Sequence, residues 1–313
     1  MTSSNRGLIW CYGFVLLDAV QAVYSGAILQ RIDGFLLCLA VFGLAANGCL
    51  LWAWARTPEH IGIAARSRAD LIGINVAAAG GWVTYLGAIQ LIEPAAAFAI
   101  LCGAVPLATI VATRLGVEEA HTARNSLEAL GQVILAAGMI LLAVATVLGW
   151  SGFVRGGASV AVAGVAMSIA CGALMAAMLL YGSRLDKRGV GPVAQFGLRF
   201  PLFLAIALAA FLLGIDNKGP VPTDDMLIAI AAGLVLLAFP VYAVQKAVSL
   251  STTLTIGTAA AVTPLVVFLL QMVEGRVEYS RATLAGLAIY FAGAMLAALG
   301  NVRAVANEAR RPA

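Results

Sequence analysis

Residues 94–115 read PAAAFAILCGAVPLATIVATRL, a stretch in which the only charged side chain is that of Arg114. About 20 consecutive apolar residues allow a helix to cross the hydrocarbon core of a bilayer. The stretch therefore predicts a membrane-spanning helix. Pro106 lies inside it, and because a proline removes a helical hydrogen bond, we expect the helix to be interrupted there.

The rest of the chain has the same character. Of its 313 residues, 62% are hydrophobic and 11% are charged, whereas a soluble domain carries about 25% charged residues. Apolar stretches of spanning length recur between short polar or Gly/Pro segments. We expect ten spanning helices, near residues 8–29, 33–54, 70–91, 94–115, 127–149, 158–181, 192–214, 226–247, 252–273 and 283–302.

A second stretch repeats the first one. The segment CGAVPL at 102–107 matches AAVTPL at 260–265, so that Pro264 stands where the first stretch has Pro106. A match at a fixed offset indicates that a chain contains related halves.

Glycines downstream of the two prolines extend this match. Gly131 and Gly138 correspond to Gly286 and Gly293, and the two pairs have the same spacing. That spacing places both glycines of a pair on one face of a helix. The repeat therefore covers spanning helices as well as the segments around the prolines.

Two halves with five spans each follow from the repeat, and we place them at residues 1–152 and 153–313. Because five is an odd number, the second half enters the membrane in the opposite orientation. The expected fold is an all-α integral membrane protein with ten transmembrane helices in two inverted five-helix repeats. Such folds place the substrate site between the halves, near the membrane midplane, where interrupted helices line a cavity. The prolines expected to interrupt helices there are Pro106, Pro264, Pro201 and Pro240.

The distribution of positive charge predicts the orientation, because Lys and Arg accumulate in cytoplasmic loops. With the N-terminus inside, more of the 19 Lys and Arg residues fall in inner loops than in outer loops. Arg66, Arg68 and Arg188 are inner examples, and Arg155 is an outer one. We expect both termini in the cytoplasm. The net charge of +4 then reflects topology and indicates no nucleic-acid partner.

In these features the sequence resembles the drug/metabolite transporter superfamily, specifically its EamA-type members with ten spans in two five-helix repeats. The features are the two prolines inside spans, Glu119 and Glu274 at the ends of spans, the glycine-spaced helices, and Leu198-Arg199-Phe200 early in the seventh span. The resemblance covers nearly the whole chain. It implies secondary transport of small metabolites, commonly export of amino acids or drug-like molecules across the bacterial inner (cytoplasmic) membrane.

Most charged residues of the predicted spans lie within two residues of a span end, but two lie deeper, where charge is costly and marks functional candidates. Asp18 lies near the centre of the first span. It is expected to bind a proton or a cationic substrate group, or else to be a neutral hydrogen-bonding group between helices. Arg199 lies about two turns into the seventh span and requires a carboxylate, helix-end carbonyls or an anionic substrate group. The alternative is that Arg199 extends toward the cytoplasmic headgroups.

Amide and aromatic side chains in the spans are candidates to line the substrate cavity, although aromatic residues also form interface belts and packing contacts. The candidates are Asn47, Asn75, Trp82, Tyr85 and Tyr242. Glu93, by contrast, precedes Pro94 at the outer end of the third span. It could form a gate or be a solvated loop charge, and we expect the loop charge.

The sequence contains no phosphate-binding loop and no cluster of His, Asp or Glu inside a span. We therefore expect no catalytic residues, no metal, no cofactor and no enzymatic activity. The five cysteines all lie in apolar stretches and are expected to be buried thiols.

The leading functional hypothesis is a proton-coupled carrier that works by alternating access in the lipid bilayer, as a monomer or a homodimer. Its partners would be the lipid and a small-molecule substrate. An uncoupled facilitator or importer is the alternative within transport. A membrane enzyme acting on a lipid, or a scaffold, would belong to other classes.

Overall fold

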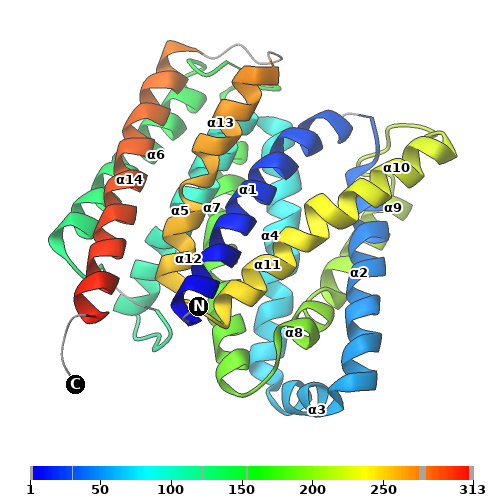
Figure 1. Ribbon diagram of the computed structural model, residues 1–313. Coiled ribbons are helices and arrows are strands. Elements are labelled where there is room, and N and C mark those ends of the chain that lie inside the picture. Colours follow the sequence, from blue (N-terminus) through cyan, green and yellow to red (C-terminus); the bar gives the residue numbers. More distant parts are fainter. Residues whose placement is uncertain (1–2, 30, 121–122, 153, 275–279, 310–313) are drawn as a thin grey trace. The chain divides into compact units, whose positions relative to one another are not determined.

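The computed structural model describes residues 3–29, 31–120, 123–152, 154–274 and 280–309. Within these ranges every regular element is helical, and the one β-contact is an isolated bridge between Ile92 and Val154. The elements (Figure 1) are α1 (Ser3–Ile28), α2 (Gly34–Arg56), α3 (Pro58–Arg66), α4 (Arg68–Leu91), α5 (Pro94–Arg114), α6 (Ser126–Val147), α7 (Ala158–Lys187), α8 (Pro192–Leu198), α9 (Pro201–Leu212), α10 (Thr223–Gly233), the π-helix η1 (Leu234–Ala238), α11 (Phe239–Val248), α12 (Thr253–Ala260), α13 (Thr263–Glu274) and α14 (Arg281–Ala309).

The prediction of an all-α fold is confirmed for this part of the chain. Nine helical segments in it are long and apolar enough to cross a membrane, and they coincide with nine of the expected spans. The apolar part of α1, Ile9–Tyr24, is shorter. These helices indicate a multi-pass membrane protein.

Polar residues in the short segments between the spans cap the N-termini of α2 and α6. Asp33 precedes α2, and its Oδ1 accepts hydrogen bonds from the amides of Phe35 and Leu36 at 2.9 and 3.0 Å. Asn125 caps α6 in the same way, by accepting from the Glu128 amide at 2.9 Å. Such caps satisfy amides that have no helical partner, so α2 and α6 begin where the sequence supplies an acceptor.

Contacts divide the chain into two compact units. Unit 1 comprises Met1–Leu86 and Ala177–Ser251, and unit 2 comprises Gly87–Ala176 and Thr252–Ala313. Each unit thus combines helices from both halves of the sequence, and α4 and α7 contribute to both units. Helices of one sequence repeat can pack against helices of the other, so units defined by contacts do not locate the repeat boundaries. The boundaries at residues 1–152 and 153–313 stay a prediction.

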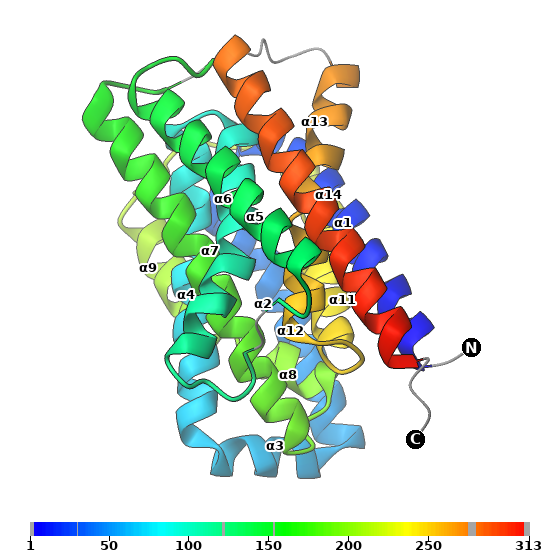
Figure 2. The ribbon, with the colours of Figure 1, turned by 90° about the vertical axis from the view of Figure 1, so that its left-hand side faces the viewer.

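In unit 2, α6 and α14 pack closely side by side (Figure 2). A Cβ at Gly131 would collide with the backbone of Ala297, and a Cβ at Gly138 would collide with the backbone of Tyr290. The later residue of α6, Gly138, thus faces the earlier residue of α14, Tyr290. The two helices are therefore antiparallel. Glycine permits this approach because it has no side chain.

The contacts between α6 and α14 are reciprocal. A Cβ at Gly286 would meet Leu142, just as a Cβ at Gly131 would meet Ala297. The sequence offset that relates Gly131 to Gly286 also relates Leu142 to Ala297. Corresponding residues of the two helices therefore have corresponding partners.

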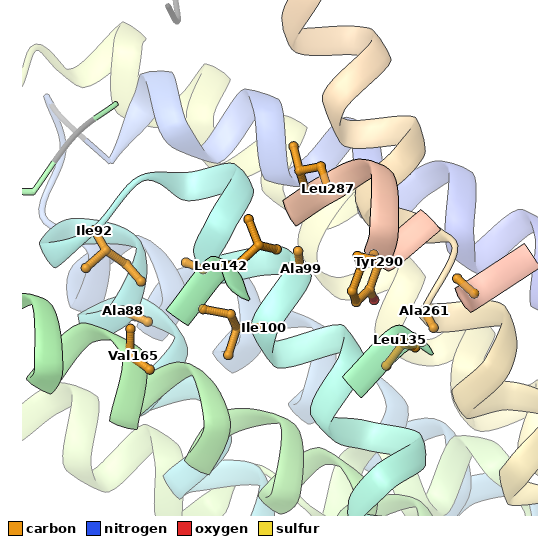
Figure 3. Packing of buried hydrophobic residues seen from close by; sticks show 12 residues of the cluster. Ala88, Ile92, Ala99, Ile100, Leu135, Leu142, Val165, Ala261, Leu287 and Tyr290 are labelled. Atoms are coloured by element: carbon orange, nitrogen blue, oxygen red, sulfur yellow. The ribbon is translucent and has the colours of Figure 1, made fainter. Parts of the chain in front are cut away.

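The hydrophobic core of unit 2 surrounds α5 (Figure 3). Small side chains such as Ala97 and Ala99 are fully buried, and they let larger neighbours approach the helix. Tyr290 from α14 is one of these neighbours, and it packs against Gly103 of α5. The core thus joins helices from both halves of the sequence.

Two of the prolines expected to interrupt helices do so. Pro201 begins α9 after α8 has ended, and Pro264 lies in the first turn of α13 after α12 has ended. Pro240 lies in the first turn of α11 directly after η1, so the helical path there is altered by a π-helix and is not broken.

The prediction that Pro106 interrupts its helix is wrong. α5 runs continuously from Pro94 to Arg114. A proline removes one helical hydrogen bond, and membrane helices tolerate this loss where other groups compensate. Next to Pro106, the hydroxyl of Thr109 donates to the Val105 carbonyl at 3.0 Å, which adds a side-chain bond to the turn after the proline.

Candidate functional site

The guanidinium of Arg199 is buried in unit 1, where the helical path is interrupted between α8 and α9. Its side chain is 1% exposed. Nη1 donates to Gln245 Oε1 at 3.0 Å, and Nη2 donates to the Val241 carbonyl at 3.0 Å. The guanidinium carbon lies 5.6 Å and 5.3 Å from the ring centres of Phe196 and Phe200. Dipoles and aromatic faces therefore solvate this charge.

Within the described ranges no carboxylate forms an ion pair with Arg199, and its Nε has no hydrogen-bond partner. An arginine side chain stays protonated in proteins. The spanning segment thus contains a permanent, buried positive charge that has no counter-charge among the residues the structure describes. The expected alternative, extension toward the headgroups, does not occur.

Asn75 of α4 holds the interruption beside Arg199 in place. Its Nδ2 donates to the Leu198 carbonyl at 2.8 Å and to the Leu71 carbonyl at 2.9 Å. Its Oδ1 accepts from the Leu202 amide at 3.4 Å. Asn75 thus satisfies backbone groups on both sides of the interruption, and its role in lining a cavity stays a prediction.

Two glutamines extend the polar contacts of Arg199 toward the start of α8. The Nε2 of Gln245 donates to Gln195 Oε1, and the Nε2 of Gln195 donates to the Val190 carbonyl at 2.8 Å. Gln195 and Gln245 are 1% and 2% exposed. Sequence reasoning missed both residues as site components, although an amide inside an apolar span was the signal that could have found them.

Trp82 and Tyr85, two predicted cavity residues, belong to a buried aromatic cluster next to Arg199. The ring of Phe42 lies 4.5 Å from that of Phe200 and 4.6 Å from that of Trp82. Trp82 in turn contacts Tyr85 at 5.6 Å, and the Tyr85 hydroxyl accepts from the Gln21 amide at 3.0 Å. The cluster thus joins α2 and α4 to the interruption between α8 and α9.

Tyr242 lies on α11, which also carries Gln245 and Val241, the hydrogen-bond partners of Arg199. Its ring lies 6.1 Å from that of Trp10 and 6.5 Å from that of Phe196. Because Phe196 also contacts the guanidinium, Tyr242 is one aromatic ring removed from the charge. The half-buried Tyr242 is more accessible than Trp82 or Tyr85.

Asp18 lies in α1, which packs against η1 and α11. It is half-buried, on the side of the helix that carries the buried Val15 and Ala22. Among the residues with described positions, none forms a hydrogen bond or an ion pair with its carboxylate. The expected alternative, a hydrogen bond to a neighbouring helix, is not present.

Asn47 is not brought into these contacts. It is exposed on α2, and its Nδ2 donates to the Gly43 carbonyl of its own helix at 2.7 Å.

Glu93, expected to be a solvated loop charge, is fully buried in unit 2, and this expectation is wrong. Its Oε2 accepts from the Gly152 amide at 2.9 Å and from the Thr283 hydroxyl at 3.0 Å. It lies just outside the spans, before Pro94. Burial raises the pKa of the Glu93 carboxyl by more than these two hydrogen bonds lower it.

Replacing Glu93 with glutamine is expected to remove part of the pH dependence of stability. Because the pKa is raised in the folded state, the stabilisation is complete below the unfolded pKa and is lost as pH rises through the folded pKa. Between about pH 5 and pH 8, the wild type should lose more thermal stability than Glu93→Gln, by about 2–4 °C.

Unfolding temperatures of the purified proteins across this pH range provide the measurement. Glu118→Gln, at an exposed carboxylate, serves as the control and should follow the wild type. Equal slopes for the wild type and Glu93→Gln would contradict the prediction.

Comparisons with known proteins identify the fold alone. No protein-family model matches the sequence, and no curated protein matches it. A solved structure described only as "Crystal structure of protein" is similar, with a TM-score of 0.67 and 18% sequence identity. The match covers 98% of this chain and 99% of that chain, so the whole helical arrangement has a counterpart.

No three His, Cys, Asp or Glu side chains come together to hold a metal ion anywhere in the part of the chain that the structure describes.

Proposed function

We propose that this protein is a secondary transporter that moves small metabolites across a membrane by alternating access. The observation that carries the proposal is the pair of intramembrane charges in unit 1. Arg199 is buried without a carboxylate partner, and Asp18 is half-buried without any polar partner among the described residues. Charged side chains at membrane depth are costly, and they mark ion and substrate pathways.

The helix interruptions support the same proposal. Irregular backbone at membrane depth is tolerated where protein or a water-filled cavity surrounds it, and transporters use such segments at their binding sites. Arg199 lies at one interruption, and its Nη2 bonds to Val241 shortly after η1. π-Helices are also frequent at functional sites. Charge and irregular backbone thus occur at the same place.

We further propose that the chain forms two inverted repeats of five spans, as in the drug/metabolite transporters it resembles. The antiparallel, reciprocal contacts between α6 and α14 support this, because equivalent helices of inverted repeats run in opposite directions. The proposed setting is the bacterial inner membrane, with both termini in the cytoplasm. The proposed cargo is an amino acid or a drug-like molecule, moved by a monomer or a homodimer without enzymatic chemistry.

Flux measurements in reconstituted vesicles test this function. Wild-type protein is expected to move at least one member of a panel of amino acids and hydrophobic cations when a pH gradient is imposed. Flux no higher than in protein-free vesicles, across the panel, would overturn the transporter proposal.

Replacing Asp18 with asparagine is expected to abolish the response of that flux to the pH gradient, because an amide cannot exchange a proton. Movement of substrate down its own gradient should persist. Asp225→Asn, at an exposed carboxylate in the first turn of α10, should leave both unchanged. Gradient-driven flux that survives in Asp18→Asn would refute the role of Asp18, and flux that never responds to pH would favour an uncoupled facilitator.

A further inference from the structure

The junction between α12 and α13 deprives backbone carbonyls of their helical donors. The Val262 amide donates to the Ala259 carbonyl, and the Leu265 amide donates to the Val262 carbonyl, both at 3.0 Å. In a regular α-helix these amides would donate four residues back, to Thr258 and Ala261. The carbonyl oxygens of Thr258 and Ala261 therefore lose their regular partners in the first half of the apolar span Thr255–Val273.

Pro264 removes a third donor. Its nitrogen carries no hydrogen, so it gives nothing to the carbonyl of Ala260, the last residue of α12. The C-terminal end of a helix also carries partial negative charge, which favours a cation nearby. The carbonyl oxygens of Thr258, Ala260 and Ala261 thus all lose their regular donors at this junction inside the span.

Two threonine hydroxyls flank the same junction. Thr258 is 2% exposed and Thr263 is 0% exposed. Neither Oγ1 has a hydrogen-bond partner among the residues whose positions are described. Buried hydroxyl groups are normally paired with protein or water, so two unpaired hydroxyls on either side of one junction require an explanation.

A third hydroxyl lies in the same region. The phenol oxygen of Tyr290 is buried and has no described hydrogen-bond partner. Tyr290 and Ala261 belong to one hydrophobic cluster, and Figure 3 shows them in the same part of it. Gly103 leaves room for the ring of Tyr290, and Gly138 leaves room for its backbone.

These polar groups are specific to the second half of the chain. The offset that relates Pro106 to Pro264 relates Ile100 to Thr258 and Val105 to Thr263. The matched positions of α5 are thus apolar, and α5 is continuous. Repeat symmetry accounts for the proline but does not account for the hydroxyls.

We propose that the junction between α12 and α13 binds a sodium ion. The ligands are the hydroxyl oxygens of Thr258 and Thr263 and the carbonyl oxygens that the junction frees, with the Tyr290 hydroxyl beside them. All of these oxygens are neutral, which suits a monovalent cation, whereas Ca²⁺ and Mg²⁺ sites contain carboxylates. Interrupted membrane helices coordinate Na⁺ through freed carbonyls in the same manner. The site lies within unit 2 and does not depend on the proposed transport function.

Thermal unfolding of the purified full-length protein tests the site without any transport measurement. Unfolding temperatures are compared in sodium chloride and in N-methylglucamine chloride of equal concentration. Sodium is expected to raise the unfolding temperature of the wild type by about 2–4 °C, because a ligand that binds only the folded state stabilises it. Thr258→Val and Thr263→Val should each abolish this shift, and Tyr290→Phe should reduce it.

The unfolding temperatures of the variants without sodium show whether the hydroxyls bind a sodium ion or a water molecule. In N-methylglucamine chloride, Thr258→Val and Thr263→Val should be at least as stable as the wild type, because valine replaces a hydroxyl that then has no partner. Thr109→Val is the matched control, since Thr109 is equally buried but donates to Val105. This control should keep the full sodium shift.

Three results would overturn the proposal. One is an unfolding temperature of the wild type that does not depend on sodium. Another is a loss of stability in Thr258→Val and Thr263→Val that is equal in both salts, because the hydroxyls would then hold a water molecule. The third is loss of the shift in Thr109→Val, which would mean that sodium acts on the fold in general.

Discussion

Replacing Arg199 with methionine is expected to lower the proposed transport activity by about 10- to 100-fold while the protein still folds. A hydrogen bond to a charged group contributes about 1.5–3 kcal/mol, and each 1.4 kcal/mol is a factor of ten. The variant loses the bonds to Gln245 and Val241 that connect the interruption before α9 to α11. Methionine fills the space, and removal of an uncompensated buried charge offsets the lost bonds. The unfolding temperature should therefore change by only about 2–4 °C.

Vesicle flux of a substrate that the wild type moves, normalised to folded protein, provides the measurement. Arg31→Gln, at an exposed arginine, should retain full flux. Gln245→Glu offers the opposite change, because it gives Arg199 a carboxylate partner. If Arg199 exchanges partners during transport, this ion pair should raise the unfolding temperature and lower the flux. Full flux in both Arg199→Met and Gln245→Glu would show that Arg199 has only a structural role.

Replacing Gly138 with alanine is expected to destabilise the protein by at least about 1–3 kcal/mol, the largest effect on folding among these variants. The added methyl group would collide with the backbone of Tyr290 on α14, so α6 and α14 would have to separate. Gly43→Ala is the matched control, because nothing lies near a Cβ at Gly43 in the middle of α2. In a helix, alanine is otherwise favoured over glycine by about 1 kcal/mol, so the control should be slightly stabilised.

Equilibrium unfolding in mixed micelles gives both free energies. We expect the free energy of unfolding to fall in Gly138→Ala and to rise slightly in Gly43→Ala, although the chemical change is the same. This prediction is contradicted if Gly138→Ala is as stable as Gly43→Ala.

The spanning helices could be predicted from the sequence because hydrocarbon imposes a simple length and polarity requirement on each of them. Their interruptions were harder to predict. Pro264 and Pro106 have similar local sequences, yet only Pro264 follows a junction between helices. The consequence of a proline depends on the groups that replace its missing hydrogen bond, and these come from neighbouring turns and helices.

Parts of the site could be predicted by residue type but not by role. Arg199 and Asp18 were identified because charge in an apolar span is costly. The partners of Arg199 could not be identified, because Gln245 lies far along the chain and the sequence does not show which helix faces meet. Asn75 was predicted as a cavity residue, but its bonds to the backbone at Leu198 and Leu202 could not be predicted from the sequence. Glu93 follows a span and precedes a proline, as a surface residue would, and nothing local shows that Gly152 and Thr283 enclose it.

The hydrogen bond between Asn75 and Leu198 also constrains how the protein is made. A ribosome synthesises the chain from its N-terminus, so α4 enters the bilayer long before Leu198 exists. Until α8 arrives, the Asn75 amide cannot reach this acceptor, and unit 1 lacks Ala177–Ser251. The early helices of unit 1 must therefore stay in the membrane without their final packing partners until the later helices are inserted. Lipid, water or the insertion machinery contacts them during this time. Neither unit can therefore finish folding before its late segment is synthesised, because each unit combines early and late parts of the chain.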